Sequence, residues 1–456
     1  MGVSLPAVWP DWAEALIAHP TLLQQIADGA GGAFHVVHPP TFARNLADFQ
    51  AVFTEFEIEG LVYFAKKANK STAWLRAVAE AGAGVDVASL GEFRSALGHG
   101  VRGEKLVVTG PAKSDELLWL AVRHGALIAV DELSELERAI AFGSQEQPVR
   151  VLLRAVAAEQ PDTRFGMSGP ERKAAVHRCA DAGAAVRMEG FSLHLSGYDP
   201  LARAVKAGRL AVEIGQARAL GLPADTISIG GGFAVDYVRQ EDWEAFQAET
   251  GPSQFHAKKE FPGGFYPYHS PVSGAGALAE VLTSRYGSEG PDLREATIAE
   301  ALRAKGIKLA VEPGRALLAD AGVSVFEVQG FKWREHLQYG IATVAGTSLS
   351  LSEQWFASEF LPEPRLWPEG GAQQRTPSAV GGTSCLDSDM LTWRKLPLPR
   401  PPKRGDFLVY PNTAGYQMDS NESAFHELPI PKKVVLDLTG PEPRWFFEEA
   451  AWKACG

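Results

Sequence analysis

The chain has 456 residues, 45% of them apolar, and a formal net charge of −11, which together predict a large core in two or three domains and argue against a nucleic-acid partner. No apolar run reaches the ~18 residues that a membrane-spanning helix needs, and residues 1–12 lack the basic and apolar segments of a secretory signal. The scattered cysteines, Cys179, Cys385 and Cys455, provide neither a disulfide framework nor a zinc spacing, so we expect a cytoplasmic protein without a bound metal.

The part of the chain between about residue 60 and about residue 315 alternates short apolar runs with longer amphipathic stretches. This alternation predicts an α/β fold with parallel strands joined by right-handed helical crossovers. We expect eight strands, the number that closes a (β/α)8 TIM barrel, whereas an open doubly wound sheet would usually contain fewer. The expected strands are Leu61–Lys66, Gly84–Val87, Lys105–Thr109, Ala126–Val130, Val149–Arg154, Gly190–Leu195, Thr226–Ile229 and Lys308–Val311, and helices are expected over Ser89–Leu97, Glu116–His124, Glu132–Phe142 and Leu201–Ala219.

The rest of the chain is expected to form a second, mainly β domain. We expect residues 1–34 to join it, residues 35–318 to form the barrel, and residues 319–456 to make up its C-terminal part. The barrel would carry a long insertion at about residues 238–300, rich in aromatic residues. This insertion is either a surface excursion with a small core of its own or a lid or wall of the substrate pocket. The strands expected outside the barrel are Phe34–His38, Val323–Gln329, Tyr339–Val344, Phe407–Tyr410 and Lys433–Leu438.

Three motifs at the carboxyl ends of predicted strands suit a phosphorylated aldehyde cofactor. The amine of Lys67 can condense with an aldehyde, and Glu312 can keep a pyridine nitrogen protonated. The run from Gly230 to Gly232 lets backbone N–H groups approach a phosphate closely. Because the active site of a TIM barrel lies at this end of the strands, the pattern favours pyridoxal 5′-phosphate. Other residues expected at the same rim are Asp86, Arg154 and His194.

The order of these motifs resembles that of the fold-type III pyridoxal-phosphate decarboxylases, the group that includes diaminopimelate, ornithine and arginine decarboxylases. The resemblance implies an alanine-racemase-like barrel followed by a β domain, pyridoxal 5′-phosphate as the cofactor, and α-decarboxylation of an amino acid. It also implies a homodimer with shared active sites, because the cysteine segment of the family reaches the active site of the partner. The segments that carry it are Phe64–Asn69, Gly84–Ser89, Arg164–Gly166, Phe191–Gly197, Ile227–Phe233, Glu312–Arg315, Gly382–Asp389 and Ala414–Tyr416.

The same resemblance implies a role for each matching residue. Lys67 would bind the cofactor covalently beside Asp86, which steers its proton, and His194 would stack on the cofactor ring. Cys385 or Lys67 would return a proton to Cα after CO2 leaves. The catalytic residues would be Lys67, Asp86, His194 and Cys385; the cofactor-binding residues Lys67, His194, Ser196, Gly230, Gly231, Gly232, Glu312, Gly314, Arg315 and Tyr416; and the residues that face the substrate Arg164, Leu386 and Asp389.

The chain departs from the family pattern at three places. Gly197 stands where the family has a phosphate-binding serine, so Ser196 or the amide of Gly197 would replace it. The stretch Ser352–Phe356 lacks the arginine that binds the distal carboxylate of diaminopimelate, and Leu386 replaces the acid that follows the cysteine. An uncompensated buried charge is costly. We therefore expect a substrate with a neutral or bulky side chain, free or attached to a carrier, rather than diaminopimelate or ornithine.

Two other functions are compatible with such a barrel. Racemisation or epimerisation needs two opposed proton donors at Cα and usually avoids a protonated pyridine, which Glu312 would promote. A non-catalytic binding protein on a decayed fold is the second alternative, and the intact set of Lys67, Glu312 and Cys385 argues against it.

Overall fold

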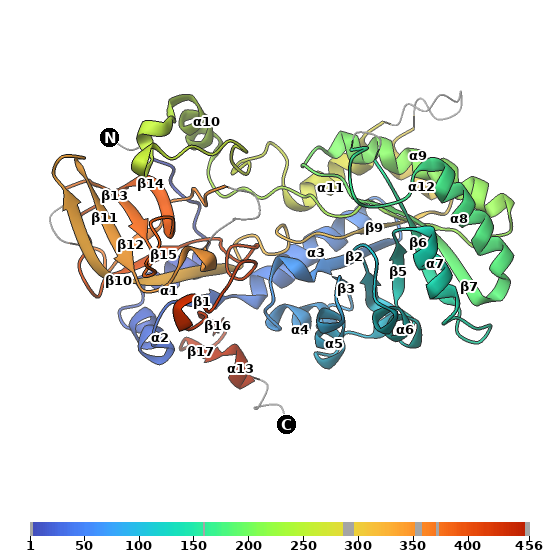
Figure 1. Cartoon of the computed structure of the whole chain (residues 1–456), viewed down its shortest axis with the longest axis horizontal. Coiled ribbons are helices and arrows are strands. Elements are labelled where there is room, and N and C mark those ends of the chain that lie inside the picture. The colour runs from blue at the N-terminus through green and yellow to red at the C-terminus, as the bar shows by residue number, and fades with distance from the viewer. Residues whose placement is uncertain (1–2, 158–159, 286–295, 352–357, 371–373, 452–456) are drawn as a thin grey trace.

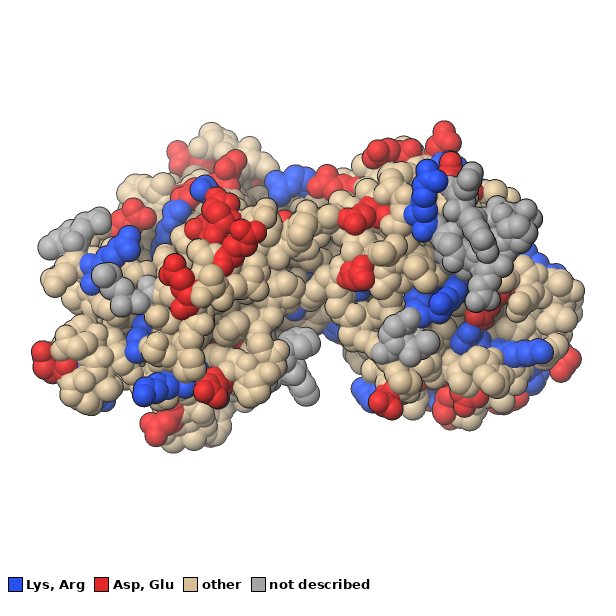
Figure 2. Space-filling view, turned by 90° about the horizontal axis from the view of Figure 1, so that it is seen from above, with Lys and Arg blue, Asp and Glu red and all other residues tan. Residues whose placement is uncertain are grey.

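The computed structural model describes residues 3–157, 160–285, 296–351, 358–370 and 374–451. Figure 1 shows two lobes side by side, one a strand barrel ringed by helices and the other built mainly from β-sheet. The lobes stay distinct when seen from above, where acidic and basic side chains are interspersed and a waist separates the two halves (Figure 2).

Parallel strands close into a barrel, as the sequence predicts, because the first barrel strand pairs with the last. The side chains of Tyr63, Val107, Leu127, Leu152 and Ala310 fill its interior. The outer faces of the strands pack beneath the helices, so both faces are buried and the strands read as continuous apolar runs. The strands are β2 (Gly60–Ala65), β3 (Gly84–Val87), β4 (Leu106–Val108), β5 (Leu127–Val130), β6 (Val149–Ala155), β7 (Val186–Leu193), β8 (Thr226–Ser228) and β9 (Lys308–Val311).

Helices surround the barrel on the outside (Figure 1). The four that the sequence predicts are present, with ends shifted by a few residues. They belong to the set α3 (Pro39–Glu55), α4 (Ala73–Glu80), α5 (Leu90–Gly98), α6 (Asp115–Arg123), α7 (Leu133–Ile140), α8 (Gly169–Ala182), α9 (Pro200–Ala219), α11 (Gly274–Thr283) and α12 (Ile298–Ala304).

The first barrel strand ends earlier than predicted. β2 stops at Ala65, and Lys66–Ala68 form a short 3-10 turn. The directions of Lys66 and Lys67 are therefore set by a turn and not by strand alternation. β7 likewise begins and ends a few residues earlier than the predicted strand Gly190–Leu195. It ends at Leu193, so His194 lies just beyond the strand.

The second lobe contains one sheet made from both ends of the chain. β1 (Phe34–Val37) pairs antiparallel with β10 (Gly322–Arg334) and parallel with β16 (Lys432–Asp437). The expected domain division at residue 35 therefore passes through a strand of this sheet. The helices α1 (Asp11–Ala18) and α2 (Leu22–Ala30) share a hydrophobic core with it. The other elements of the lobe are β11 (Tyr339–Val344), β12 (Arg365–Trp367), β13 (Thr376–Gly381), β14 (Met390–Leu398), β15 (Phe407–Tyr410), β17 (Arg444–Phe447) and α13 (Glu448–Ala451).

The aromatic insertion connects the two lobes. Its helix α10 (Gln240–Glu249) lies over the end of the sheet near β13 and β14 (Figure 1). Phe255 forms a bridge with Arg394 of β14, and His256 Nδ1 lies 2.7 Å from the hydroxyl of Tyr339. Most of its aromatic side chains thus pack against the β lobe, while α11 and α12 pack on the barrel helices. Part of the expected insertion, residues 286–295, lies outside the described residues.

Candidate active site

Two adjoining cavities lie at the carboxyl ends of the barrel strands and share Lys67, His194 and Glu312. The first has a volume of about 370 Å³ and includes Arg164 and Phe165. The second has a volume of about 230 Å³. It is lined by residues of Gly230–Gly232, called the glycine loop below, and by residues of the 312–315 and 414–416 segments. The fold therefore brings together, around one opening, most of the residues that the sequence singles out.

Lys67 lies against a buried carboxylate. Its Nζ is 3.2 Å from Oδ2 of Asp86, and the other carboxylate oxygen accepts a hydrogen bond from the hydroxyl of Thr109 (2.6 Å). The Lys67 side chain is 47% exposed, into the cavity, whereas Asp86 is 2% exposed. The charge of Asp86 is the main cause that raises the pKa of Lys67. Without cofactor, Lys67 is therefore an ammonium that Asp86 holds in place. Sequence reasoning missed Thr109, although it ends a predicted strand at the rim.

The neighbouring lysine is buried. Lys66 is 3% exposed, and its Nζ donates to the carbonyl oxygens of Asn69 (3.3 Å) and Lys70 (2.6 Å). Burial lowers the pKa of Lys66 to about 8. Its amine therefore closes the turn that presents Lys67.

Glu312 is a buried acid at the centre of the site. Its Oε1 accepts a hydrogen bond from the hydroxyl of Ser228 (2.6 Å). Burial, followed by the nearby charge of Asp86, raises the pKa of Glu312 to about 7. A carboxyl held in this way can share a proton with a ring nitrogen near neutral pH. Ser228 was not expected from the sequence, although it is a polar residue at the end of a strand of otherwise apolar character.

His194 opens onto both cavities and lies against the glycine loop. A Cβ at Gly230 would come within 2.9 Å of its Nδ1, and Gly230 has φ +67°. Although the ring faces a cavity, the surrounding protein removes water from it and lowers the pKa of His194 to about 4; the charge of Lys67 acts in the same direction. The imidazole is therefore neutral at pH 7 and can pack on an aromatic ring without bringing a charge to it.

The glycine loop offers free backbone donors. Among the described residues, the N–H groups of Gly231 and Gly232 have no acceptor within the protein. A Cβ at Gly231 would lie 2.7 Å from the carbonyl oxygen of Glu312, and one at Gly232 would overlap Arg203. Only glycine fits at these positions, and two unpaired donors beside a cavity suit the oxygens of a phosphate.

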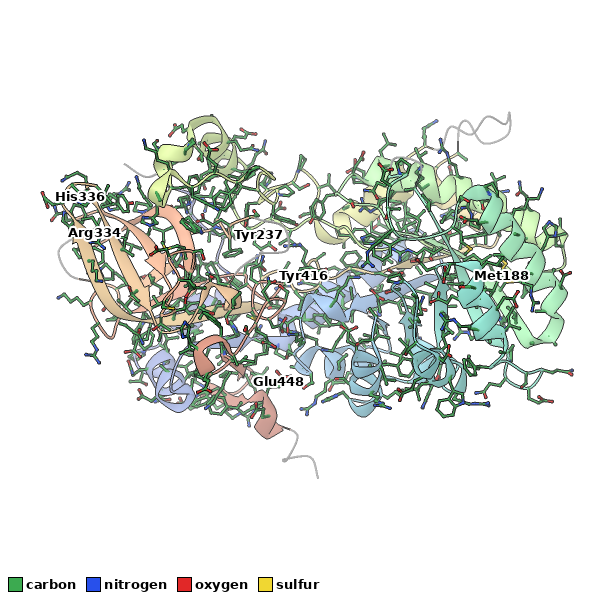
Figure 3. All side chains as sticks on the ribbon, in the orientation of Figure 1. Met188, Tyr237, Arg334, His336, Tyr416 and Glu448 are labelled. Atoms are coloured by element: carbon green, nitrogen blue, oxygen red, sulfur yellow. The ribbon has the colours of Figure 1, made fainter. Side chains whose placement is uncertain are left out.

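Arg315 and Tyr416 complete the same end of the site. The guanidinium of Arg315 lies 4.1 Å from the ring centre of Tyr266 and 4.9 Å from that of Tyr416, and it donates to the hydroxyl of Tyr237 (3.3 Å). Tyr416 has φ +74°, and its N–H donates to the carbonyl of Ala68 beside Lys67. Figure 3 shows Tyr237 and Tyr416 between the two lobes. Tyr266 is thus the part of the aromatic insertion that reaches the site. Gly314 lies beside Tyr416, where a Cβ would be 3.2 Å from its hydroxyl.

The first cavity has a cationic wall. Arg154 and Arg164 lie on Phe165, with each guanidinium carbon 4.4 Å from the ring centre. Nη1 of Arg154 is 3.2 Å from Oδ1 of Asp131, which also accepts the N–H of Gly166. Arg164 is exposed, and none of the described residues forms an ion pair with it. The wall therefore presents a guanidinium that a ligand can reach.

Ser196 and Gly197, which the sequence offers in place of the family's phosphate-binding serine, both line the second cavity. Ser196 is exposed, and its N–H is 3.4 Å from Oε1 of Gln160. Gly197 has φ +84°, and its carbonyl accepts a hydrogen bond from Arg203 (2.6 Å). The geometry does not bring the Ser196 hydroxyl into a hydrogen bond with any described residue.

The cysteine segment lies in the β lobe, outside the linings of both cavities. Cys385 is exposed, with its Sγ 3.2 Å from Nε2 of His426, and Leu386 is 50% exposed beside it. Asp389 is buried, and its carboxylate accepts the N–H groups of Ser348 (2.7 Å) and Ser384 (3.2 Å). Both carboxylate oxygens of Asp389 therefore help to hold this turn, and its expected contact with the substrate stays a prediction. His426 was not expected from the sequence.

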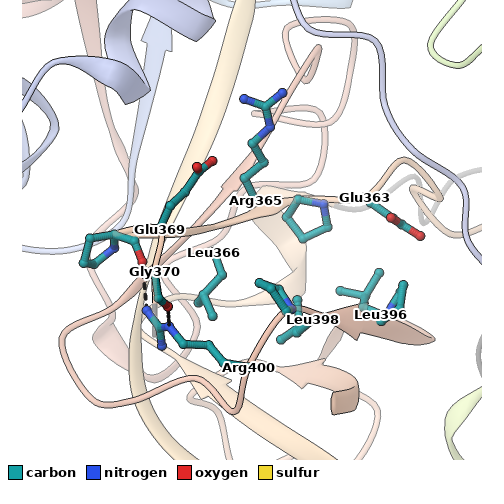
Figure 4. A pocket seen from close by; sticks show the side chains of 12 residues that line it. Glu363, Arg365, Leu366, Glu369, Gly370, Leu396, Leu398 and Arg400 are labelled. Atoms are coloured by element: carbon teal, nitrogen blue, oxygen red, sulfur yellow. Dashed lines mark hydrogen bonds between the residues drawn. The ribbon is translucent and has the colours of Figure 1, made fainter. Parts of the chain in front are cut away.

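Another pocket, of about 310 Å³, lies in the β lobe, away from these groups (Figure 4). Its arginines already have partners: Arg365 pairs with Glu14, and Arg400 with Asp406. Nothing in its lining offers a nucleophile or an unpaired cation, so it does not compete with the barrel site.

Comparison with known proteins supports the same chemistry. Residues 41–264 match the family model described as the pyridoxal binding domain of pyridoxal-dependent decarboxylases. The "Uncharacterized protein y4yA" of Sinorhizobium fredii is 37% identical over 94% of this chain and 93% of its own length. A diaminopimelate decarboxylase of Actinosynnema pretiosum is 29% identical over 83% of this chain and 79% of its own. The chain belongs to the fold-type III pyridoxal-phosphate-dependent decarboxylase family.

Solved structures share the fold of this chain. A lysine/ornithine decarboxylase of Vibrio vulnificus, complexed with cadaverine, has a TM-score of 0.72 at 20% identity and covers 94% of this chain and 99% of its own. A diaminopimelate decarboxylase of M. jannaschii has a TM-score of 0.73 at 18% identity, covering 93% and 90%. As a fold-type III decarboxylase, the protein is a pyridoxal-phosphate-dependent carboxy-lyase, and racemisation is not favoured.

The residues present fit this cofactor. Lys67 supplies the amine, the glycine loop supplies unpaired N–H donors, and Glu312 supplies a buried carboxyl at the same opening.

Within the described residues, no helix is both long and apolar enough to cross a bilayer. The stretch Ser352–Phe356, where the sequence lacks the family's arginine, lies outside those residues.

Proposed function

We propose that this decarboxylase acts on an amino acid with a neutral or bulky side chain, free or attached to a carrier, rather than on diaminopimelate or ornithine. The observation that carries the proposal is the charge of the first cavity. Among its described lining residues, Glu312 is the one carboxylate, while Arg154 and Arg164 are both cations. Glu312 is held at the centre of the site by its hydrogen bond from Ser228.

A cationic side chain would be disfavoured in this cavity. Asp131 is already paired with Arg154, so the distal ammonium of ornithine would enter beside two guanidinium groups with no free acid among the described lining residues, and burying an unpaired charge costs ~3–5 kcal/mol. Diaminopimelate carries the same distal ammonium together with a distal carboxylate, and residues 352–356 lack the arginine by which the family binds that carboxylate. A neutral chain meets no such cost, and the exposed Arg164 can donate to an amide or ester oxygen along it. Phe165 offers an apolar face to a bulky group.

We assign the following roles within that reaction. When bound, pyridoxal phosphate supplies the electron sink that stabilises negative charge at Cα as CO2 leaves. Lys67 would hold the cofactor and Asp86 would steer the Lys67 proton. Glu312 would hold a proton at the pyridine nitrogen, while the neutral ring of His194 would pack against the cofactor ring. Arg315 and the glycine loop would bind the phosphate.

We further propose that the active enzyme is a homodimer in which each site uses two chains. Cys385 lies outside both barrel cavities of its own chain and is exposed, next to the exposed side chains of Leu386 and Phe425. A second copy would place this segment at the opening of the partner's barrel. The thiol of Cys385 would then give a proton to Cα, and His426, 3.2 Å away, would restore it.

A CO2-release screen over a broad amino-acid panel tests the substrate class. Neutral and carrier-linked amino acids should exceed ornithine, lysine and diaminopimelate in kcat/KM by about 100-fold or more, the equivalent of roughly 3 kcal/mol of lost charge compensation. The variant K67A supplies the background. Efficient turnover of diaminopimelate or ornithine by the purified protein would contradict the proposed substrate class and leave the reaction type intact.

Mixing two inactive variants tests the shared site. K67A and C385A each disable one contribution, so random exchange of subunits should restore about a quarter of the wild-type activity, because a heterodimer retains one intact site. The mixture of K67A with E312Q is the control: both substitutions lie in the barrel, and no recovery is expected. Recovery in the control mixture, or its absence in the first, would contradict the shared site.

A further inference from the structure

A buried arginine lies directly behind the glycine loop. Arg203, in the first turn of α9, is 1% exposed. Its Nε donates to the carbonyl of Gly231 (3.0 Å), and its Nη2 donates to the carbonyls of Gly197 (2.6 Å) and Leu195 (3.3 Å). Its Nη1 donates to the carbonyl of Asp199 (3.0 Å). One side chain thus joins the loop after β7 to the loop after β8.

These bonds fix the direction of the backbone donors. In a trans peptide the carbonyl of one residue and the N–H of the next point in opposite directions. Because the carbonyl of Gly231 points to Arg203, the N–H of Gly232 points away from it, and both glycines line the second cavity. The guanidinium also occupies the space that a Cβ at Gly232 would need, since that atom would lie 1.9 Å from Nη2.

None of the described residues provides a close counter-ion for Arg203. Its four hydrogen bonds described above all go to carbonyl oxygens, and none of these partners is a carboxylate. The carboxylate of Asp199, which acts on it through space, is exposed and caps α9 by accepting the N–H groups of Leu201 and Ala202. A buried cation is stable only when an anion or a full set of acceptors compensates it.

We propose that Arg203 is a positioning residue that aims the glycine loop at the cofactor phosphate and supplies fixed positive charge behind it. This arrangement compensates for the absence of the family's serine at Gly197, because the loop that lacks the serine hydroxyl is held by the guanidinium instead. The phosphate dianion in turn is the counter-ion of the buried cation. The inference rests on the cofactor of the family and not on the proposed substrate class.

Cofactor binding to the apoprotein tests this role, with the visible absorbance band as the readout. In R203M, the Kd of pyridoxal 5′-phosphate should rise about 100-fold, and in R203K about 10-fold, because lysine keeps the charge but cannot hold four carbonyls. The Kd of pyridoxal, which has no phosphate, should change less than about 3-fold. R209M, on the exposed face of the same helix, is the matched control and should bind both as the wild type does.

Equal losses for both compounds in the Arg203 variants would mean a merely structural role and would overturn the proposal, as would unchanged binding. The wild-type apoprotein provides a measurement that does not depend on variant folding. Replacing chloride by inorganic phosphate at constant ionic strength should raise its Tm by several degrees. No rise would also overturn the proposal. Because cofactor binding is the readout, an error in the proposed substrate would not affect these outcomes.

Discussion

Replacing Lys67 with alanine should reduce kcat by about 1,000-fold or more, because the residue that holds the cofactor covalently acts together with the rest of the site. The same change should abolish the visible absorbance of the bound cofactor. In the wild type, borohydride reduction followed by peptide mapping should label Lys67 and no other lysine. These results are expected because Lys67 opens into both cavities and Asp86 orients its amine there.

Lys66 provides the matched control for this experiment. It is adjacent in sequence, but its amine is buried and bonded to two backbone carbonyls. K66Q should lower the stability of the turn and still be labelled at Lys67. Labelling of Lys66 in the wild type, or retention of the absorbance band in K67A, would contradict the assignment.

Glu312→Gln should have opposite effects on activity and on apoprotein stability. In the loaded enzyme kcat should fall about 100- to 1,000-fold, the usual loss for one charge-stabilising group in an active site, because glutamine cannot hold a proton at the pyridine nitrogen. In the apoprotein, E312Q should match the wild type near pH 4 and become more stable than it above pH 7. Urea unfolding of both apoproteins at pH 4 to 8 measures the second effect.

The sign follows from the raised pKa of Glu312, which burial brings to about 7 from an ordinary value near 4.5. Between these values the folded protein binds the proton and the unfolded chain does not, so stability falls as the pH rises through this window. Glutamine stays neutral and does not lose stability with pH. The difference above pH 7 should be on the order of a few kcal/mol.

Glu359 is the matched control for Glu312. It is a buried acid of the β lobe whose pKa burial raises to about 8, and its Oε1 accepts the N–H of Arg394. E359Q should show the same pH-dependent gain in stability and leave kcat unchanged. A fall in kcat for E359Q, or a pH-independent difference for E312Q, would contradict a specific role for Glu312.

The fold could be predicted from the sequence because each barrel strand carries its own local signal: an apolar run followed by a helix. The chemistry at Lys67 and Glu312 was recognisable because each residue ends such a run. Thr109, Ser228 and Arg203 were missed, because their partners come from other strands and loops and no spacing along the chain identifies them.

The end of the first barrel strand was predicted one residue too late, because Lys66 continues the run Leu61–Ala65 in the sequence but belongs to a 3-10 turn. The spacing of Asp389 from Cys385 predicts a contact with the substrate; in the structure its oxygens bind backbone N–H groups of its own lobe, and the substrate contact stays a prediction. Spacing identifies a position and does not determine which way a carboxylate faces.

The parallel pairing of β1 with β16 has a consequence for biosynthesis. The strand Phe34–Val37 leaves the ribosome early, yet its neighbour β16 follows roughly 400 residues later, which at ~5–20 residues/s is a delay of about 20–80 s. Until then the apolar faces of α1 and α2 have no complete sheet to cover. The barrel can close during this interval, so the nascent chain would carry a folded barrel and an incomplete β lobe. Its exposed apolar helices would then be a binding site for a chaperone.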